Sequence, residues 1–141
     1  MSVATIITTD LSSLELVEVW SKSDPTERVR FDFPISGETG ASGASVAYAE
    51  IDPGGAIPMH HDSANEVDII LEGELEYDVN GEAKVIGPGV LVQIPSEVKH
   101  RVRNRGERPA RLVFFFDGPS DVVVFDEPLM PMDATVLGGE G

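Results

Sequence analysis

The sequence contains no cysteine, which excludes disulfides, thiolate nucleophiles and zinc or iron–sulfur sites built on cysteine. It also has little positive charge, because ten Lys and Arg residues stand against 25 Asp and Glu residues and leave a formal net charge of −15. Binding to phosphate backbones or to anionic lipid surfaces requires basic patches. We therefore expect neither nucleic acid nor a membrane as a partner.

Long apolar segments are absent as well. No run approaches the roughly 18–20 residues of a membrane span, and the start of the chain, Met1 to Thr5, lacks the basic and long apolar stretches of a secretory signal. Hydrophobic residues nevertheless make up 41% of the 141 residues, which suffices for one core and is too many for a disordered acidic chain. The composition predicts a soluble, cytoplasmic protein of one domain.

Helical periodicity is scarce, and most apolar residues alternate with polar ones, which is the pattern of half-buried strands. Only Leu11 to Trp20 has spacing that suits a helix, and it suits a strand equally. Asn80-Gly81 indicates a hairpin, because a type I′ turn needs positive φ at both central residues. We expect strands at residues 44–51, 66–71, 74–79, 85–86, 90–94, 98–104, 110–116 and 121–125. Short strands punctuated by Gly and Pro predict an all-β barrel or sandwich.

All three histidines lie in two short windows. In the first window, His60 and Asp62 point to one face if the chain is extended there, and His61 points to the other. Glu66 begins the next expected strand, and His100 comes from a distant one. Imidazole and carboxylate groups are ligands of divalent metals, so these residues are candidates for a metal site.

The two windows resemble the two sequence motifs of the cupin superfamily, whose members are small antiparallel barrels of jelly-roll type. The matched positions are Gly54, His60, Glu66 and Gly73 in the first motif, and Gly89, Pro95, His100 and Asn104 in the second. The resemblance implies an all-β, antiparallel jelly-roll β-barrel over residues 44–126. Residues 1–43 are then expected to pack on the barrel, and residues 127–141 to form an irregular C-terminal tail.

Two positions depart from the motifs, because Asp62 stands where the family usually has its second histidine and Glu97 where it usually has glycine. The resemblance implies a metal inside the barrel on His60, Asp62, Glu66 and His100. Asp62 and Glu66 are also the candidate catalytic residues, with Asp62 as fourth ligand or as a nearby general base. This oxygen-rich set favours Mn²⁺ or Fe²⁺, with Zn²⁺ or Ni²⁺ as the alternatives.

Two alternatives to this ligand set stay open. A bend after Pro58 would turn His61 inward and restore three imidazoles. The substitution at Asp62 also leaves open a barrel without metal, although burying Asp62 beside Glu66 without a cation would be costly or would force one of them to be protonated.

The function implied by the resemblance is that of a metal-dependent enzyme acting on a small organic molecule, with a dioxygenase as the first expectation. Such a site leaves coordination positions for a bidentate substrate and for O₂. Decarboxylases, isomerases and lyases use similar sites. A barrel that only binds a sugar or another small metabolite is the non-catalytic alternative.

Three further features bear on surfaces and neighbours. The run Phe114 to Phe116 directs aromatic rings to both faces of one strand, so we expect a second subunit or the terminal segments to cover the outer face, and we predict a homodimer. Three arginines at alternate positions, Arg101, Arg103 and Arg105, should point outward. We expect them to pair with acids such as Glu74, Glu76 or Asp78. Asp68 shares a face with Glu66 and lies either beside the metal or in an exposed patch.

Overall fold

The computed structural model describes residues 6–138. Twelve strands form one antiparallel sheet in the order β7-β6-β9-β4-β11-β1-β2-β3-β10-β5-β8, with β12 paired to β11. The strands are β1 Val17–Ser21, β2 Arg28–Ile35, β3 Ala44–Ile51, β4 Ala56–Asp62, β5 Glu66–Glu72, β6 Leu75–Val79, β7 Glu82–Ile86, β8 Leu91–Ile94, β9 His100–Arg103, β10 Ala110–Asp117, β11 Val122–Met130 and β12 Ala134–Gly138. The described helices are two 3-10 turns, Leu11–Ser13 and Gly37–Thr39, and neither has the length or apolar character of a membrane-spanning helix.

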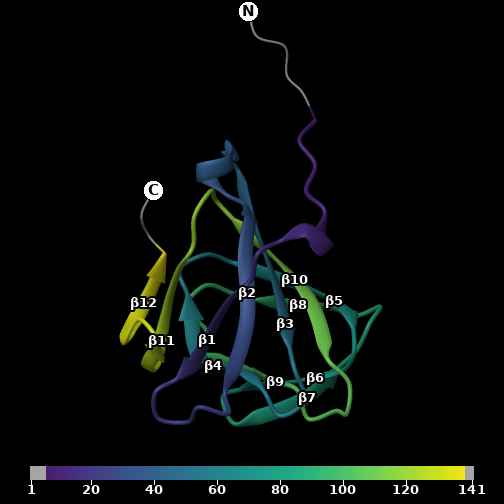
Figure 1. Cartoon of the computed structure of the whole chain (residues 1–141), viewed down its shortest axis with the longest axis vertical. Coiled ribbons are helices and arrows are strands. Elements are labelled where there is room, and N and C mark those ends of the chain that lie inside the picture. Colours follow the sequence, from purple (N-terminus) through teal and green to yellow (C-terminus); the bar gives the residue numbers. More distant parts are fainter. Residues whose placement is uncertain (1–5, 139–141) are drawn as a thin grey trace, which may run out of the picture.

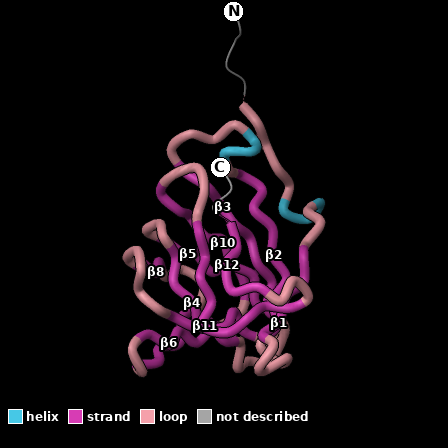
Figure 2. Tube along the Cα trace, turned by 90° about the vertical axis from the view of Figure 1, so that its left-hand side faces the viewer, coloured by secondary structure: helices cyan, strands magenta, loops and turns pink. Residues whose placement is uncertain are grey.

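The sheet curls around an apolar core and forms a jelly-roll barrel, with loops gathered at its two ends (Figure 1). Ile51, Leu75, Leu112 and Leu129 in this core are fully buried. In the view of Figure 2, β4 and β11 lie side by side on the near wall, and they are paired from Val123 to Phe125 of β11. The prediction of an all-β, antiparallel jelly-roll barrel is confirmed.

The period-two pattern predicted most strands because it marks one buried and one exposed face. β3 has the expected bounds, and β10 carries buried Phe114 and Phe116 on one face and the 42% exposed Phe115 on the other. The predicted hairpin joins β6 to β7, where φ is 54° at Asn80 and 79° at Gly81. Both values have the sign that a type I′ turn requires.

The expectation of an irregular tail is wrong for the described part of the chain, because β11 continues to Met130 and β12 pairs with it. Residues 28–35 form β2, a strand that was not predicted although Val29, Phe31 and Phe33 alternate with polar residues. The ambiguous segment from Leu11 forms a 3-10 turn and then β1. With β1 and β2 in the sheet, the barrel draws on residues outside 44–126.

Two motif positions have structural roles at loops. Gly73 has φ 82°, and a Cβ there would lie 2.9 Å from the Cα of Ala110. The buried side chain of Asn104 donates to the carbonyl oxygens of Ile51 and Arg108, both at 2.8 Å. Its Oδ1 accepts from the N–H of Gly106 at 2.9 Å. These bonds hold the loop after β9 against the end of β3.

The outward arginines pair with acids, but only one of them uses the predicted partner. Arg105 contacts Glu76 at 2.9 Å, as expected. Arg101 and Arg103 instead share Oε2 of Glu27, at 3.0 and 3.1 Å. Glu27 precedes β2 and is only 6% exposed, so a long-range loop supplied the partner that the local sequence pattern could not indicate.

Candidate metal centre

Two imidazole rings face each other inside the barrel. His60 on β4 is paired in register with His100, the first residue of β9, and their ring centroids are 4.1 Å apart. Each Nδ1 donates to a main-chain carbonyl two residues earlier, that of Pro58 at 2.7 Å and that of Val98 at 2.9 Å. Because a carbonyl oxygen only accepts, the proton sits on Nδ1 and both Nε2 atoms are directed to the centre, as in metal-binding histidines.

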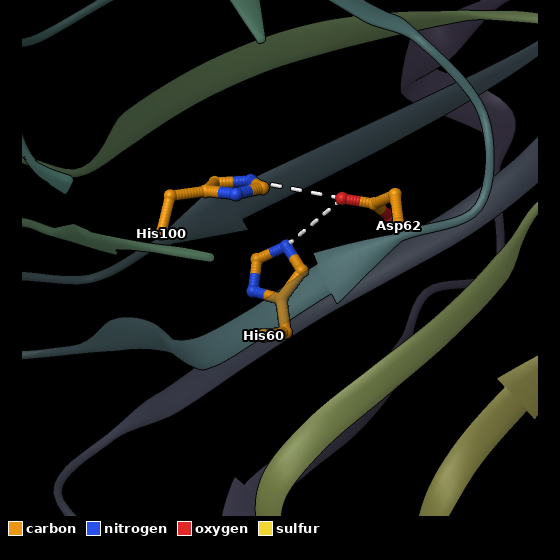
Figure 3. Close-up of side chains that lie close together, drawn as sticks. All are labelled: His60, Asp62 and His100. Atoms are coloured by element: carbon orange, nitrogen blue, oxygen red, sulfur yellow. Dashed lines mark ion pairs between the residues drawn. The ribbon is translucent and has the colours of Figure 1, made fainter. Parts of the chain in front are cut away.

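Asp62 supplies the oxygen of the cluster (Figure 3). Its Oδ2 lies 3.4 Å from Nε2 of His60 and 3.7 Å from Nε2 of His100. These three buried side chains offer ligand atoms that lie within 4.8 Å of one another, which is a spacing that could hold one metal ion.

The structure also shows which of two neighbouring side chains faces inward. β4 and β9 shift register between Ile57 and His60, so an irregularity does occur near Pro58. It leaves Asp62 buried, while His61 is partly exposed and contacts the outer Glu97 at 3.4 Å. The alternation along β4 after this irregularity accounts for the difference.

Glu66 lies beside the three-residue cluster. It is buried at the start of β5, and its Oε1 is 3.7 Å from Nε2 of His100, but it does not belong to the compact group of three. Behind it, Asp68 is fully buried and accepts a hydrogen bond from Tyr77 at 2.7 Å. Of the two expectations for Asp68, the buried position beside the candidate centre is therefore the one observed.

Several buried polar atoms at this centre have no hydrogen-bond partner within residues 6–138. They include Oδ2 of Asp62, Oε2 of Glu66 and Nε2 of His100. Leaving such atoms unpaired costs about 1–3 kcal/mol each. A divalent cation is the partner that suits two carboxylate oxygens and an imidazole nitrogen at once, so the residues present fit a metal.

The protonation of the centre also suits a cation. Burial and the neighbouring His60 lower the pKa of His100 to about 4, so this ring is neutral at pH 7 with its Nε2 lone pair free. Burial opposes the ionisation of Asp62, but its interactions with His60 and Asp121 outweigh burial and lower its pKa. Burial, followed by the nearby Asp68 and Asp62, raises the pKa of Glu66 well above its usual range.

Asp121 is a member of this environment that sequence reasoning missed. It is 5% exposed, accepts from the N–H of Ala64 at 3.1 Å and from the hydroxyl of Ser63 at 3.3 Å, and interacts with Asp62. Burial and the charge of Asp62 raise its pKa to about 8. The signal that could have identified it is an acid placed directly before the apolar run of β11.

A cavity of about 70 Å³ opens beside the cluster, and His60, Asp62 and Glu66 are among its lining residues. Most of the other lining side chains are aliphatic or aromatic and come from β1, β2, β3, β10 and β11. The candidate metal centre therefore lies at the wall of an apolar space inside the barrel.

Comparison with known proteins agrees with this geometry. The family model for a cupin domain matches residues 47–116. The polyketide synthase CurC of Streptomyces cyaneus is 36% identical over 76 residues, or 53% of this chain and 49% of the relative. Oxalate oxidase GF-3.8 of Triticum aestivum is 29% identical over 126 residues, or 82% of this chain and 56% of the relative. The chain thus spans about half the length of the curated relatives it matches.

A solved structure shows the same fold. The polyketide cyclase RemF from Streptomyces resistomycificus superposes with a TM-score of 0.67 and 19% identity, covering 80% of each chain. At this identity the likeness concerns the fold. The family match, both sequence motifs and the jelly-roll barrel lead to one conclusion: the chain belongs to the cupin superfamily.

Proposed function

We propose that this chain is a metal-dependent enzyme that acts on a small organic molecule held in the barrel cavity, with dioxygenation as the reaction. The observation that carries the proposal is the convergence of two tethered imidazoles and a buried carboxylate on one point, with ligand atoms left unpartnered. The point lies at the wall of a cavity, so a molecule in that cavity would be within reach of the ion.

The proposed ligands are His60, Asp62 and His100, with Glu66 completing the set from β5. Oxygen ligands make up half of this set, which favours Mn²⁺ or Fe²⁺ over Zn²⁺ or Ni²⁺. A bound ion of this kind supplies a Lewis acid and, for an oxygenase, the redox partner of O₂. The tethered Nδ1 atoms of the two histidines keep both rings in place while the substrate exchanges.

Glu66 is the proposed proton carrier. Burial and the nearby Asp68 and Asp62 raise its pKa well above its usual range, so where it does not bind the ion its carboxyl group is protonated and can donate a proton to the substrate and take it back afterwards. Asp62, with its lowered pKa, stays ionised and serves as ligand, or as general base when it does not coordinate. Decarboxylation, isomerisation and elimination would use the same proton transfer, and these reactions are the alternatives within the proposal.

Metal analysis of protein purified without a His-tag tests the ligand set. We expect about one Mn²⁺ or Fe²⁺ per chain in the wild type and in His61→Ala, whose side chain lies on the other face of β4, and none in His100→Ala. Undiminished metal in His100→Ala would refute the site.

Oxygen uptake tests the reaction. Uptake with a panel of catechols and enols is expected for a dioxygenase. Substrate conversion without uptake would indicate one of the three alternative reactions, and binding without conversion would indicate a non-catalytic binding protein.

A homodimer is part of the proposal. Its support is a set of exposed apolar side chains on the outer face of β5, β8 and β10, namely Val67, Leu71, Leu91 and Phe115. Paired exposed strands of this kind usually contact another surface. Light scattering should give twice the mass of one chain, and a single-chain mass over a wide concentration range would rule the dimer out. Location in the cytoplasm stays a prediction from composition.

A further inference from the structure

The cavity beside the candidate metal centre has a strongly one-sided composition. Twelve of its fifteen lining residues are apolar, and the three polar ones are His60, Asp62 and Glu66. Five of the six phenylalanines of the chain line it. Within the described residues, no Lys, Arg, Asn, Gln, Ser or Thr contributes to this lining.

The phenylalanines form a continuous aromatic wall. Phe31 and Phe33 of β2 meet edge to face at 5.9 Å between ring centroids. Phe33 stacks on Phe116 at 6.1 Å, and Phe116 stacks on Phe114 of the same strand at 6.3 Å. Rings in such offset and edge-to-face arrangements present faces and edges that suit another aromatic ring.

The wall extends from partly exposed rings to buried rings of the cavity that the candidate centre also lines. Phe31 and Phe33 are partly exposed, whereas Phe114 and Phe116 are buried. On the opposite side, Phe125 of β11 packs against the ring of His60 at 5.2 Å. A molecule in this cavity would therefore lie against aromatic rings and within reach of His60, Asp62 and Glu66, which line the same space.

The size of the cavity agrees with a small ring. A water molecule needs roughly 10–15 Å³ of such space, so 70 Å³ has room for about five waters. Five waters occupy about the volume of one six-membered ring, at roughly 30 Å³ each in the liquid. Larger substituents would extend towards β2 and solvent.

The lining is unsuited to a small dianion. A dicarboxylate that chelates a metal through two oxygens keeps two more oxygens that need hydrogen-bond donors or cations. The Nδ1 proton of His60 is already donated to Pro58, and the other polar groups of the lining are carboxyl groups. Burying unpaired carboxylate oxygens against phenylalanine rings and next to carboxyl groups is strongly unfavourable.

We propose that this site selects molecules in which a metal-chelating oxygen group is carried on an aromatic or conjugated ring, and that it discriminates against ringless carboxylates such as oxalate and glycolate. The inference rests on the proposed function, because it assumes the ion in the site. It assigns the specificity to Phe33, Phe114 and Phe116, outside the proposed ligand set.

Matched chelators test it by calorimetric titration of the Mn²⁺-loaded protein. Glycolate and mandelate share an α-hydroxycarboxylate and differ by a phenyl ring, and oxalate is the dianion. We expect mandelate to bind at least tenfold more tightly than glycolate or oxalate. Phe116→Leu should reduce the preference for mandelate about three- to tenfold, and Phe115→Leu, on the outer face of the same strand, should leave it unchanged.

A charge variant keeps the test independent of the loss of a buried ring. Phe33 is partly exposed, so in Phe33→Arg the guanidinium can stay hydrated at the outer part of the cavity. This variant should bind oxalate about tenfold more tightly and mandelate less tightly than the wild type.

The outcomes separate the two proposals. If the protein loads Mn²⁺ but binds glycolate and oxalate as tightly as mandelate, the specificity is refuted and the proposed function stands. If the ring preference exists but survives Phe116→Leu and Phe33→Arg unchanged, its assignment to the aromatic wall is refuted. If the protein takes up no Mn²⁺ or Fe²⁺, the proposed function fails and the specificity fails with it.

Discussion

Removing bound metal is expected to make the protein less stable as the pH rises from 6.5 to 7.5. Burial raises the pKa of Glu66 well above its usual value, and burial together with Asp62 raises the pKa of Asp121 from 3.8 to about 8. A group with a higher pKa in the folded state binds more protons there than in the unfolded chain. Its contribution is fully present below the unfolded pKa and is lost as the pH rises towards the folded one. Each such proton changes the free energy of unfolding by about 1.4 kcal/mol per pH unit.

The pH window is chosen so that opposing groups contribute little. The pKa of His100 falls from 6.5 to about 4 on folding, so the stability linked to it is lost mainly below pH 6.5. The pKa of Asp62 is lowered, so it titrates only in acid. Asp121 alone contributes close to one proton across this window, and Glu66 and Asp68, whose pKa values are also raised, act in the same direction. The metal-free protein should then lose at least about 1.4 kcal/mol between pH 6.5 and 7.5.

Urea unfolding of chelator-treated protein, followed by fluorescence of Trp20, measures this slope. Asp121→Asn keeps an oxygen for the N–H of Ala64 but holds no titrating proton, so it should reduce the slope by about 1.4 kcal/mol per pH unit. Asp117→Asn is the matched control and should leave the slope unchanged. Hydrogen bonds from Asn65 lower the pKa of Asp117, so this carboxyl group titrates only in acid. Saturating Mn²⁺ should reduce the loss, because a cation held by Asp62 and Glu66 favours the ionised forms of the carboxyl groups around it. A metal-free protein whose stability is constant or rises across this window would refute the reasoning.

Three further changes are expected to have distinct effects. Asp62→Ala should lose metal affinity while His61→Ala largely keeps it, measured by titration with Mn²⁺ and Zn²⁺; the reverse order would place His61 at the metal. Asn104→Ala removes three hydrogen bonds in a buried loop and should lower the free energy of unfolding by about 2–4 kcal/mol in urea, and a loss below 1 kcal/mol would contradict their role. Glu97→Gly relieves a residue with φ 69° and should stabilise the protein by about 0.5–1 kcal/mol in the same assay, while destabilisation would show that the exposed contact with His61 outweighs backbone strain.

Most strands, and the inward direction of His60 and Asp62 on β4, could be predicted because both follow from local alternation. Each strand has one face in the core, so the pattern of apolar residues gives the side chain directions as well as the strand. His60 and Asp62 therefore point together, as expected, and His61 points away. The backbone at Glu97 could also be predicted from the local sequence. Its φ of 69° lies in the region where glycine is favoured, and the family motif usually has glycine at this position.

Contacts between distant segments could not be predicted in this way. Glu27 and Asp121 are buried acids whose partners lie far away in the sequence, and neither belongs to a motif. Period-two patterns give the face of a side chain but not the strand that will lie opposite it, because register and strand order depend on the whole barrel. The environment of the candidate metal centre was therefore less predictable than the inward direction of His60 and Asp62.

The same distinction separates ligands from specificity. The proposed ligands occupy motif positions on β4, β5 and β9, whereas the aromatic wall comes from β2 and β10, and Phe125 of β11 lines the same cavity. β2 and β11 lie outside the match to the family model, and β10 lies within that match up to residue 116 but belongs to neither motif. Two chains with both motifs intact can thus place different side chains around the same ligand set. A cationic side chain at the position of Phe33 or Phe116 would suit a carboxylate substrate, whereas a phenylalanine there suits an aromatic substrate. Substrate class in such a barrel is therefore decided by strands that the motifs do not include.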